Sequence, residues 1–173
     1  TDHGSMYGVV EFYKQARKEG IKPILGFEAY ISPRKMTDKD PQNDKIQYHL
    51  VLLAENREGW QNLIKLCSIG FVDGYYYKPR IDHETLKKYS SGIIALSACL
   101  AGEVQTYLLE DNYDEALKTA LLYKDIFGEN NFFLELQDHG MEEQKAVNSS
   151  LLKLSKETGI RLVATNDVHY INK

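Results

Sequence analysis

The segment ATNDVHY, residues 164–170, places two ionisable residues directly after an apolar run. Asp167 and His169 are two positions apart, and residues i and i+2 of an extended strand point to the same side. If the extended conformation continues, this carboxylate and this imidazole converge on one spot. Such a pair binds a metal, works as acid and base, or simply forms hydrogen bonds, and the segment alone leaves all three open.

Other side chains with metal-ligand chemistry lie near the ends of predicted strands or, in one case, inside an apolar strand. They are His3, Glu28, His49, Cys99 and His139. In α/β folds, sites form at the carboxyl ends of the strands. Imidazole and thiolate suit zinc, and carboxylates also accept manganese or iron. The recurrence of several ligand types at one class of position favours a metal centre.

Each of these residues also has a simpler interpretation. A single histidine is more often a hydrogen-bonded structural residue than a ligand, and Cys99 alone is typical of a small buried hydrophobic side chain. Asp138 and His139 would form a turn before Gly140. Cys67 lies on an apolar helix face and is expected to be buried there.

His49 is the exception among the candidates, because it begins a strand instead of ending one. The geometry works if the strand over residues 48–54 runs back beside residues 24–31 of the preceding strand as a long hairpin. The start of the second strand then lies at the end of the first. Under that hypothesis, Glu28 and His49 share one edge of the sheet.

The apolar pattern that must position these residues predicts an α/β domain with a mostly parallel sheet, open or closed. Strands are expected over residues 21–31, 48–54, 93–96, 132–136 and 161–165. Helices are expected over residues 5–19, 57–69, 82–89, 113–127 and 142–158. In the second helix the inner face is expected to contain Trp60, Leu63, Ile64 and Cys67. Asn112 has capping-box spacing to Glu115.

Length and composition limit the class of protein. A chain of 173 residues is expected to form a single domain with a real core. The net charge of −4 argues against binding nucleic acid by bulk electrostatics, although bound cations can invert the sign of an acidic site. Two cysteines without paired spacing favour a reduced, cytoplasmic protein. No apolar run reaches the length of a membrane span, so no membrane partner is expected.

Six ordered blocks of the sequence resemble a known family. They are TDHGSMYGVVEFYKQARKEGIKPILGFEAY, YHLVLLAEN, GYYYKPRID, SACLAGE, ELQDHG and ATNDVHY. They resemble the PHP (polymerase and histidinol phosphatase) domain, most closely the version at the front of bacterial DNA polymerase III alpha subunits. The resemblance implies a distorted, TIM-like (β/α)7 barrel that holds up to three divalent ions, zinc or manganese.

The resemblance also implies a ligand set when the motifs are matched residue by residue. The metal ligands would be His3, Glu28, His49, Cys99, Asp167 and His169. Asp167, His169 and His139 are the expected catalytic residues, and Asp138 and His139 would lie beside the metals. The family's opening His-x-His motif, a nearby acidic ligand and the first strand are expected upstream of Thr1. The chain is therefore expected to be an N-terminally truncated PHP domain, without the polymerase domains and inactive by itself.

Two functions from different classes remain open at the level of the sequence. One is a metal-dependent phosphoesterase that removes nucleotides from primer 3′ ends as a 3′–5′ proofreading exonuclease during DNA replication. The other is a non-catalytic, metal-stabilised domain that braces the polymerase and binds its proofreading subunit. The expected partners are primer DNA and the other domains and subunits of the DNA polymerase III holoenzyme. Intact ligand types favour the phosphoesterase.

Overall fold

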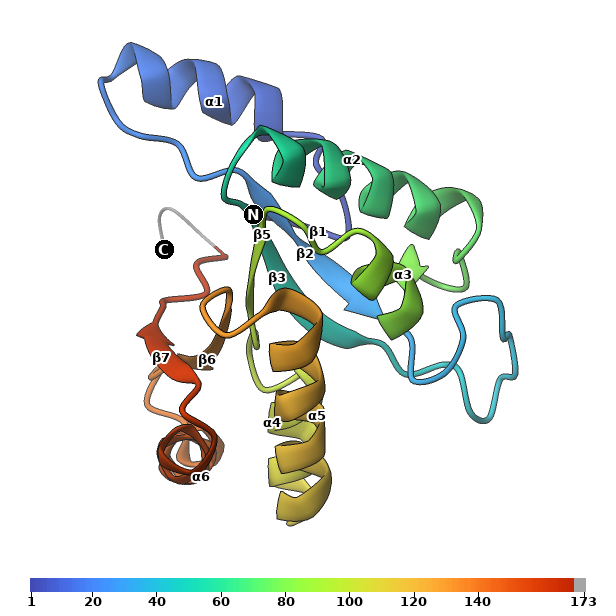
Figure 1. Cartoon of the computed structure of the whole chain (residues 1–173), viewed down its shortest axis with the longest axis vertical. Coiled ribbons are helices and arrows are strands. Elements are labelled where there is room, and N and C mark those ends of the chain that lie inside the picture. Colours follow the sequence, from blue (N-terminus) through green and yellow to red (C-terminus); the bar gives the residue numbers. More distant parts are fainter. Residues whose placement is uncertain (170–173) are drawn as a thin grey trace. The chain divides into compact units, whose positions relative to one another are not determined.

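The computed structural model describes residues 1–169 and has a mixed α/β fold (Figure 1). The chain divides into two compact units, Thr1–Ala95 and Leu96–Lys173. The α/β class expected from the alternating apolar segments is confirmed. The expectation of a single domain stays a prediction.

The first unit contains four complete strands, three helices and most of a fifth strand. The elements are β1 (Asp2–His3), α1 (Val9–Lys18), β2 (Gly26–Ile31), β3 (Tyr48–Ala54), α2 (Arg57–Val72), β4 (Arg80–Ile81), α3 (His83–Lys88) and β5 (Ile93–Leu96). Strand β2 pairs in parallel with both β1 and β4, and antiparallel with β3. The hypothesis of a hairpin between residues 24–31 and 48–54 is therefore confirmed.

As far as residue 169, the second unit contains three helices and two strands. The elements are α4 (Glu103–Leu109), α5 (Tyr113–Phe127), β6 (Phe132–Leu136), α6 (Glu142–Thr158) and β7 (Arg161–Ala164). Strands β6 and β7 pair in parallel. In the first unit the strand order is β1-β2-β3-β5, and β4 also pairs with β2.

The expected starts of one helix and one strand in the first unit were wrong. The first helix begins at Val9 instead of Ser5, because Gly4 adopts a positive φ of 65° and the chain turns before the helix. Gly8 is the N-cap residue of this helix, and its backbone N–H donates to Asp2 Oδ2 at 2.8 Å. Strand β2 begins only at Gly26, since Pro23 has no N–H to donate to a ladder.

The core of the first unit lies between α2 and the hairpin. Leu50 and Leu52 of β3 and Leu63 and Leu66 of α2 are buried almost completely. The predicted inner face of α2 was partly wrong, because Ile64 is 42% exposed and Leu66 is buried in its place. Trp60 and Cys67 are half-buried. Burial raises the pKa of the Cys67 thiol, and a hydrogen bond from the Met6 backbone opposes that shift.

Arg80 of β4 fixes the long loop that joins β2 to β3. This guanidinium is completely buried and donates to the backbone carbonyls of Met36, Asp38 and Asp44, each at 2.9 Å. It also donates to the carbonyl of Gly74 at 3.2 Å. This loop ends directly before β3. Arg80 therefore fixes the segment that leads into β3 and to His49.

Helix ends in the second unit follow the sequence closely. Asn112 caps α5 by accepting a hydrogen bond from the Glu115 backbone at 3.3 Å, which confirms the predicted cap. Gly159 ends α6 in the left-handed conformation, with φ of 73°. Helix α4 was not predicted, because it has only seven residues and its N-cap residue, Gly102, has no side chain to accept a capping hydrogen bond.

Candidate metal centre

A cluster of two histidines and one carboxylate forms in the first unit. Glu28 lies in the middle of β2 and is only 4% exposed. Parallel pairing places His3 of β1 directly beside it, and His3 Nδ1 lies 2.8 Å from Glu28 Oε1. A buried carboxylate requires charged or hydrogen-bonding partners, and His3 provides one of them.

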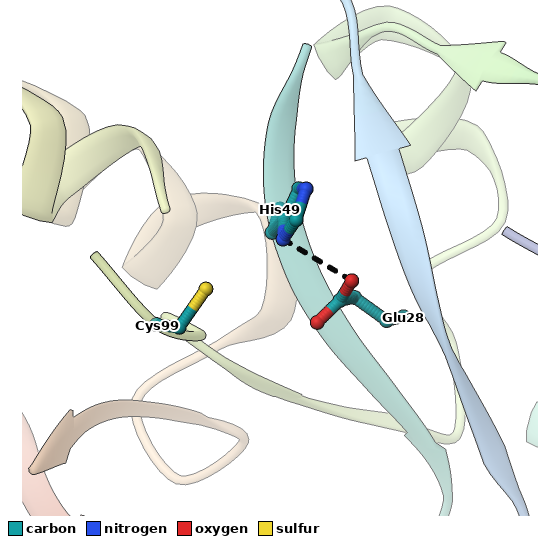
Figure 2. Close-up of side chains that lie close together, drawn as sticks. All are labelled: Glu28, His49 and Cys99. Carbon is teal, nitrogen blue, oxygen red and sulfur yellow. Dashed lines mark ion pairs between the residues drawn. The ribbon is translucent and has the colours of Figure 1, made fainter. Parts of the chain in front are cut away.

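His49 reaches the same carboxylate from the other side of β2. In the hairpin register it is opposite Tyr30, two residues beyond Glu28, and so lies on the same face of the sheet. His49 Nδ1 is 3.1 Å from Glu28 Oε1, and this ion pair is the dashed line in Figure 2. The prediction that Glu28 and His49 share one edge of the sheet is confirmed.

Gly4 and Tyr30 shape the surroundings of this cluster. The backbone N–H of Gly4 donates to the Glu28 carbonyl at 2.7 Å, which ties the TDHG turn to β2. A Cβ atom on Gly4 would lie 2.4 Å from the Tyr30 ring, so only glycine fits. The Tyr30 ring packs edge-on to the His49 ring at 5.3 Å. Burial, and secondly the charge of Glu28, raise the pKa of Tyr30, so its hydroxyl stays protonated at neutral pH.

The second unit carries the other predicted ligands in a different local structure from the one expected. Strand β7 ends at Ala164, and Asp167 adopts a positive φ of 44°, so the extended conformation does not continue through Asp167 and His169. The two residues still meet, but through a turn. His169 Nδ1 lies 2.8 Å from the Asp167 carbonyl oxygen and 3.9 Å from Asp167 Oδ1.

His139 contacts the segment that carries Asp167. Its Nε2 lies 2.7 Å from the Asn166 carbonyl, and its Nδ1 lies 2.8 Å from the Gln144 side-chain amide. A neutral ring protonated at Nε2 satisfies both contacts, since Nε2 then donates and Nδ1 accepts. Asp138 accepts from the Gly140 backbone at 2.9 Å, so it forms the turn that its sequence position indicated. The catalytic role expected for His139 stays a prediction.

Cys99 follows β5 in the second unit and is half-buried. The residue before it, Ala98, has a positive φ of 66°, which is strained for a residue with a side chain. Sequence reasoning did not single out Glu135 of β6, whose carboxylate accepts a hydrogen bond from the Ala98 backbone at 3.0 Å. Its signal was available, because Glu135 is a carboxylate inside an apolar strand, as Glu28 is.

Comparison with known proteins decides the family. The model of the family described as "PHP domain" matches residues 1–139. The chain belongs to the PHP family. This PHP chain is 47% identical to the DNA polymerase III subunit alpha of Borreliella burgdorferi and 49% identical to that of Deinococcus radiodurans. It is 45% identical to the same subunit of Thermus aquaticus.

Each of these three alignments covers all of the PHP chain but only 13–15% of the relative. The PHP chain thus spans only a small part of the length of these relatives, which are named as polymerase subunits. In the part of the chain that the structure describes, no helix is both long and apolar enough to cross a membrane.

Proposed function

We propose that this PHP domain binds divalent metal ions and hydrolyses phosphodiester bonds at primer 3′ ends, as a 3′–5′ exonuclease within a DNA polymerase III alpha subunit. The proposal includes the (β/α)7 barrel of the family. The observation that carries it is the Glu28 carboxylate, which is 4% exposed and has imidazoles from two different strands at 2.8 and 3.1 Å from one oxygen.

The donor types fit a zinc or manganese site. In this proposal Glu28 and His49 of the first unit supply a carboxylate oxygen and an imidazole nitrogen (Figure 2), and Cys99 of the second unit would add a sulfur. His3, Asp167 and His169 would complete the set. When bound, divalent ions would activate water and stabilise the leaving oxygen of the scissile phosphate.

Glu28 has a distinct part in this proposal. Both His3 and His49 direct Nδ1 toward its Oε1, so the carboxylate fixes the orientation of both rings. A carboxylate that holds one ring nitrogen of a ligand histidine sets its tautomer and raises its basicity. Glu28 would therefore organise the two imidazoles as well as supply negative charge beside a cation.

The proton transfers are assigned to the second unit. Asp167 and His169 are neighbours in one turn, so whichever of them does not give its lone pair to an ion could accept a proton from the attacking water and pass it to the leaving group. His139 is the third candidate. Both of its ring nitrogens already have protein partners, so it would act only after releasing Gln144 or the Asn166 carbonyl.

A second function, the non-catalytic brace, is favoured by one specific observation. Two imidazoles can satisfy the buried charge of Glu28 without any ion, provided that at least one of them is protonated. Such a cluster stabilises a fold by itself. The brace would hold the polymerase domains and bind a separate proofreading subunit.

One experiment separates the two functions. In the complete polymerase subunit, Asp167→Asn keeps the size of the side chain and removes its charge. If the domain is a nuclease, manganese- or zinc-dependent shortening of a mismatched primer 3′ end should fall by about 10²–10⁴-fold. Extension of a matched primer should change by less than about two-fold, because that active site would lie in other domains.

The matched control is Asp138→Asn, which keeps the oxygen that accepts from Gly140. It should retain primer shortening. If the unmodified subunit shows no metal-dependent shortening, and Asp167→Asn lowers the melting temperature and the polymerase rate together, the domain is a brace and the nuclease proposal is wrong.

A further inference from the structure

Glu135 is a buried carboxylate in the second unit that the proposed chemistry does not use. It is 4% exposed and lies in β6. Its Oε2 accepts from the Ala98 backbone at 3.0 Å, and its Oε1 accepts from the Gln137 side chain at 3.1 Å and from the Thr165 hydroxyl. Three donors therefore converge on the two oxygens of one carboxylate, both of which accept.

The first contact fixes the turn that presents Cys99. Ala98 is held in the left-handed region, and the hydrogen bond from its N–H to Glu135 helps to offset that strain. The Glu135 backbone N–H donates to Ser97 Oγ at 2.8 Å. Gln105 adds two donations, to Ser97 Oγ at 2.7 Å and to the Ala98 carbonyl at 3.0 Å. The backbone directly before Cys99 is thus held from both sides.

The second contact fixes the chain that leads to Asp167 and His169. The Thr165 hydroxyl donates to Glu135 Oε1, and the Thr165 N–H donates to the Leu136 carbonyl at 3.1 Å. Only Asn166 separates Thr165 from Asp167. One buried carboxylate therefore joins two segments that are more than sixty residues apart in the sequence and that both carry proposed ligands.

We propose that Glu135 is a positioning residue that holds the Cys99 turn and the Asp167–His169 turn in one fixed arrangement, ready for a divalent cation. The assignment of Cys99, Asp167 and His169 as ligands rests on the proposed function. The geometric part does not, because the hydrogen bonds of Glu135 set the conformation of both turns whether or not an ion is bound.

Glu135→Gln tests this role with a minimal change of shape. A glutamine offers one acceptor oxygen and one NH2 group. The NH2 group must face either the Ala98 N–H, which cannot accept, or the Gln137 NH2 group and the Thr165 hydroxyl, which must then accept instead of donate. Either arrangement weakens the hold on one of the two turns. The control is Glu103→Gln, another buried carboxylate of the same unit, which accepts from the Tyr123 hydroxyl at 2.6 Å. A glutamine oxygen can keep that bond.

The first measurement is the rate at which Cys99 reacts with a soluble aromatic disulfide in metal-free protein. The 173-residue chain is used with Cys67→Ser, so that Cys99 is its one thiol. Glu135→Gln should change this rate by about five-fold or more, and Glu103→Gln by less than two-fold, because Glu135 accepts the Ala98 N–H whereas Glu103 accepts the Tyr123 hydroxyl. Equal rates in the two variants would overturn the proposal.

The second measurement is zinc affinity by competition with a chromogenic chelator. Loss of a residue that orients ligands typically weakens metal binding about 10–100-fold, and this is expected for Glu135→Gln but not for Glu103→Gln. Thr165→Val, a milder variant that removes one hydroxyl, should weaken zinc binding while the Cys99 rate stays unchanged. If Thr165→Val binds zinc as tightly as the unmodified chain, the link to Asp167 and His169 is wrong.

The two measurements separate this proposal from the proposed function. If the unmodified chain binds no zinc, the metal centre is wrong, and the thiol rates alone then decide the positioning role of Glu135. If the unmodified chain binds zinc and Glu135→Gln matches Glu103→Gln in both measurements, the metal centre stands and the positioning role is refuted.

Discussion

Replacing Arg80 with methionine should destabilise the first unit strongly, although Arg80 touches none of the proposed ligands. The guanidinium is fully buried and donates to four backbone carbonyls, those of Met36, Asp38, Asp44 and Gly74. Burial lowers the pKa of Arg80, and the charges of Asp44, Tyr76 and Asp38 oppose that shift. Methionine fills similar space but leaves all four carbonyls without this donor.

The magnitude follows from the hydrogen bonds that are lost. A hydrogen bond to a charged group contributes roughly 1.5–3 kcal/mol, but four bonds from one group do not add, since water can reach some loop carbonyls after the change. Removing one side of a buried charged network costs about 3–5 kcal/mol, and we expect this range for Arg80→Met. Arg80→Lys should cost less than Arg80→Met, because an ammonium still has three donors and can satisfy some of the four carbonyls.

The assay is urea unfolding of the chain. The free energies of unfolding of the variants are compared with one common m-value, the slope of the unfolding free energy against urea concentration. The control is Arg161→Met. Arg161 is exposed and donates one hydrogen bond, to the Asn130 carbonyl at 2.6 Å, so its loss should cost about 1 kcal/mol or less. If Arg80→Met costs no more than Arg161→Met, the loop does not depend on the Arg80 network and the reasoning fails.

Two further predictions concern backbone packing and pH. Gly59→Ala should lower the free energy of unfolding by more than about 2 kcal/mol, because the new Cβ would lie 1.7 Å from the Gly92 carbonyl oxygen. The control is Gly159→Ala, measured in the same urea experiment. Gly159 has a φ of 73° and open space around it, so this change should cost only about 1–2 kcal/mol. Burial, and then the hydrogen bond and charge of Glu157, raise the pKa of Tyr113 to about 12. Its raised folded-state pKa contributes stability below pH about 10 that is lost as the pH rises toward 12. Tyr113→Phe should remove that part of the stability loss at alkaline pH. If the variant loses as much stability between pH 10 and 12 as the unmodified chain, the raised pKa of Tyr113 is not the cause.

The sequence was informative where one local rule determines the structure. Asn112 and Glu115 have the spacing of a helix cap, and the cap forms. The position of His49 at the start of a strand required the hairpin, because only antiparallel pairing brings that start to the end of the preceding strand. The structure places His49 Nδ1 at 3.1 Å from Glu28 Oε1 by that pairing.

The sequence was less informative where contacts between distant residues determine the local structure. Ile64 and Leu66 are both apolar residues of α2, and periodicity alone does not say which one faces the hairpin. Asp167 and His169 were expected on one face of a strand, but the strand pairs only as far as Ala164 and the chain then turns. The sequence shows Glu135 as a carboxylate inside an apolar strand, but not what it holds, because its partners Ala98 and Thr165 are distant in the sequence.

The metal centre is tested most directly by the metal content of the chain and of its Glu28→Gln variant. Both proteins are equilibrated with zinc, passed through a desalting column and analysed for bound metal per chain by plasma mass spectrometry. Glutamine keeps the size of Glu28 but removes the charge that holds His3 and His49. We expect the unmodified chain to retain at least one zinc ion and Glu28→Gln to lose it. Equal zinc content in the two proteins, or none in the unmodified chain, would contradict a metal centre built on Glu28.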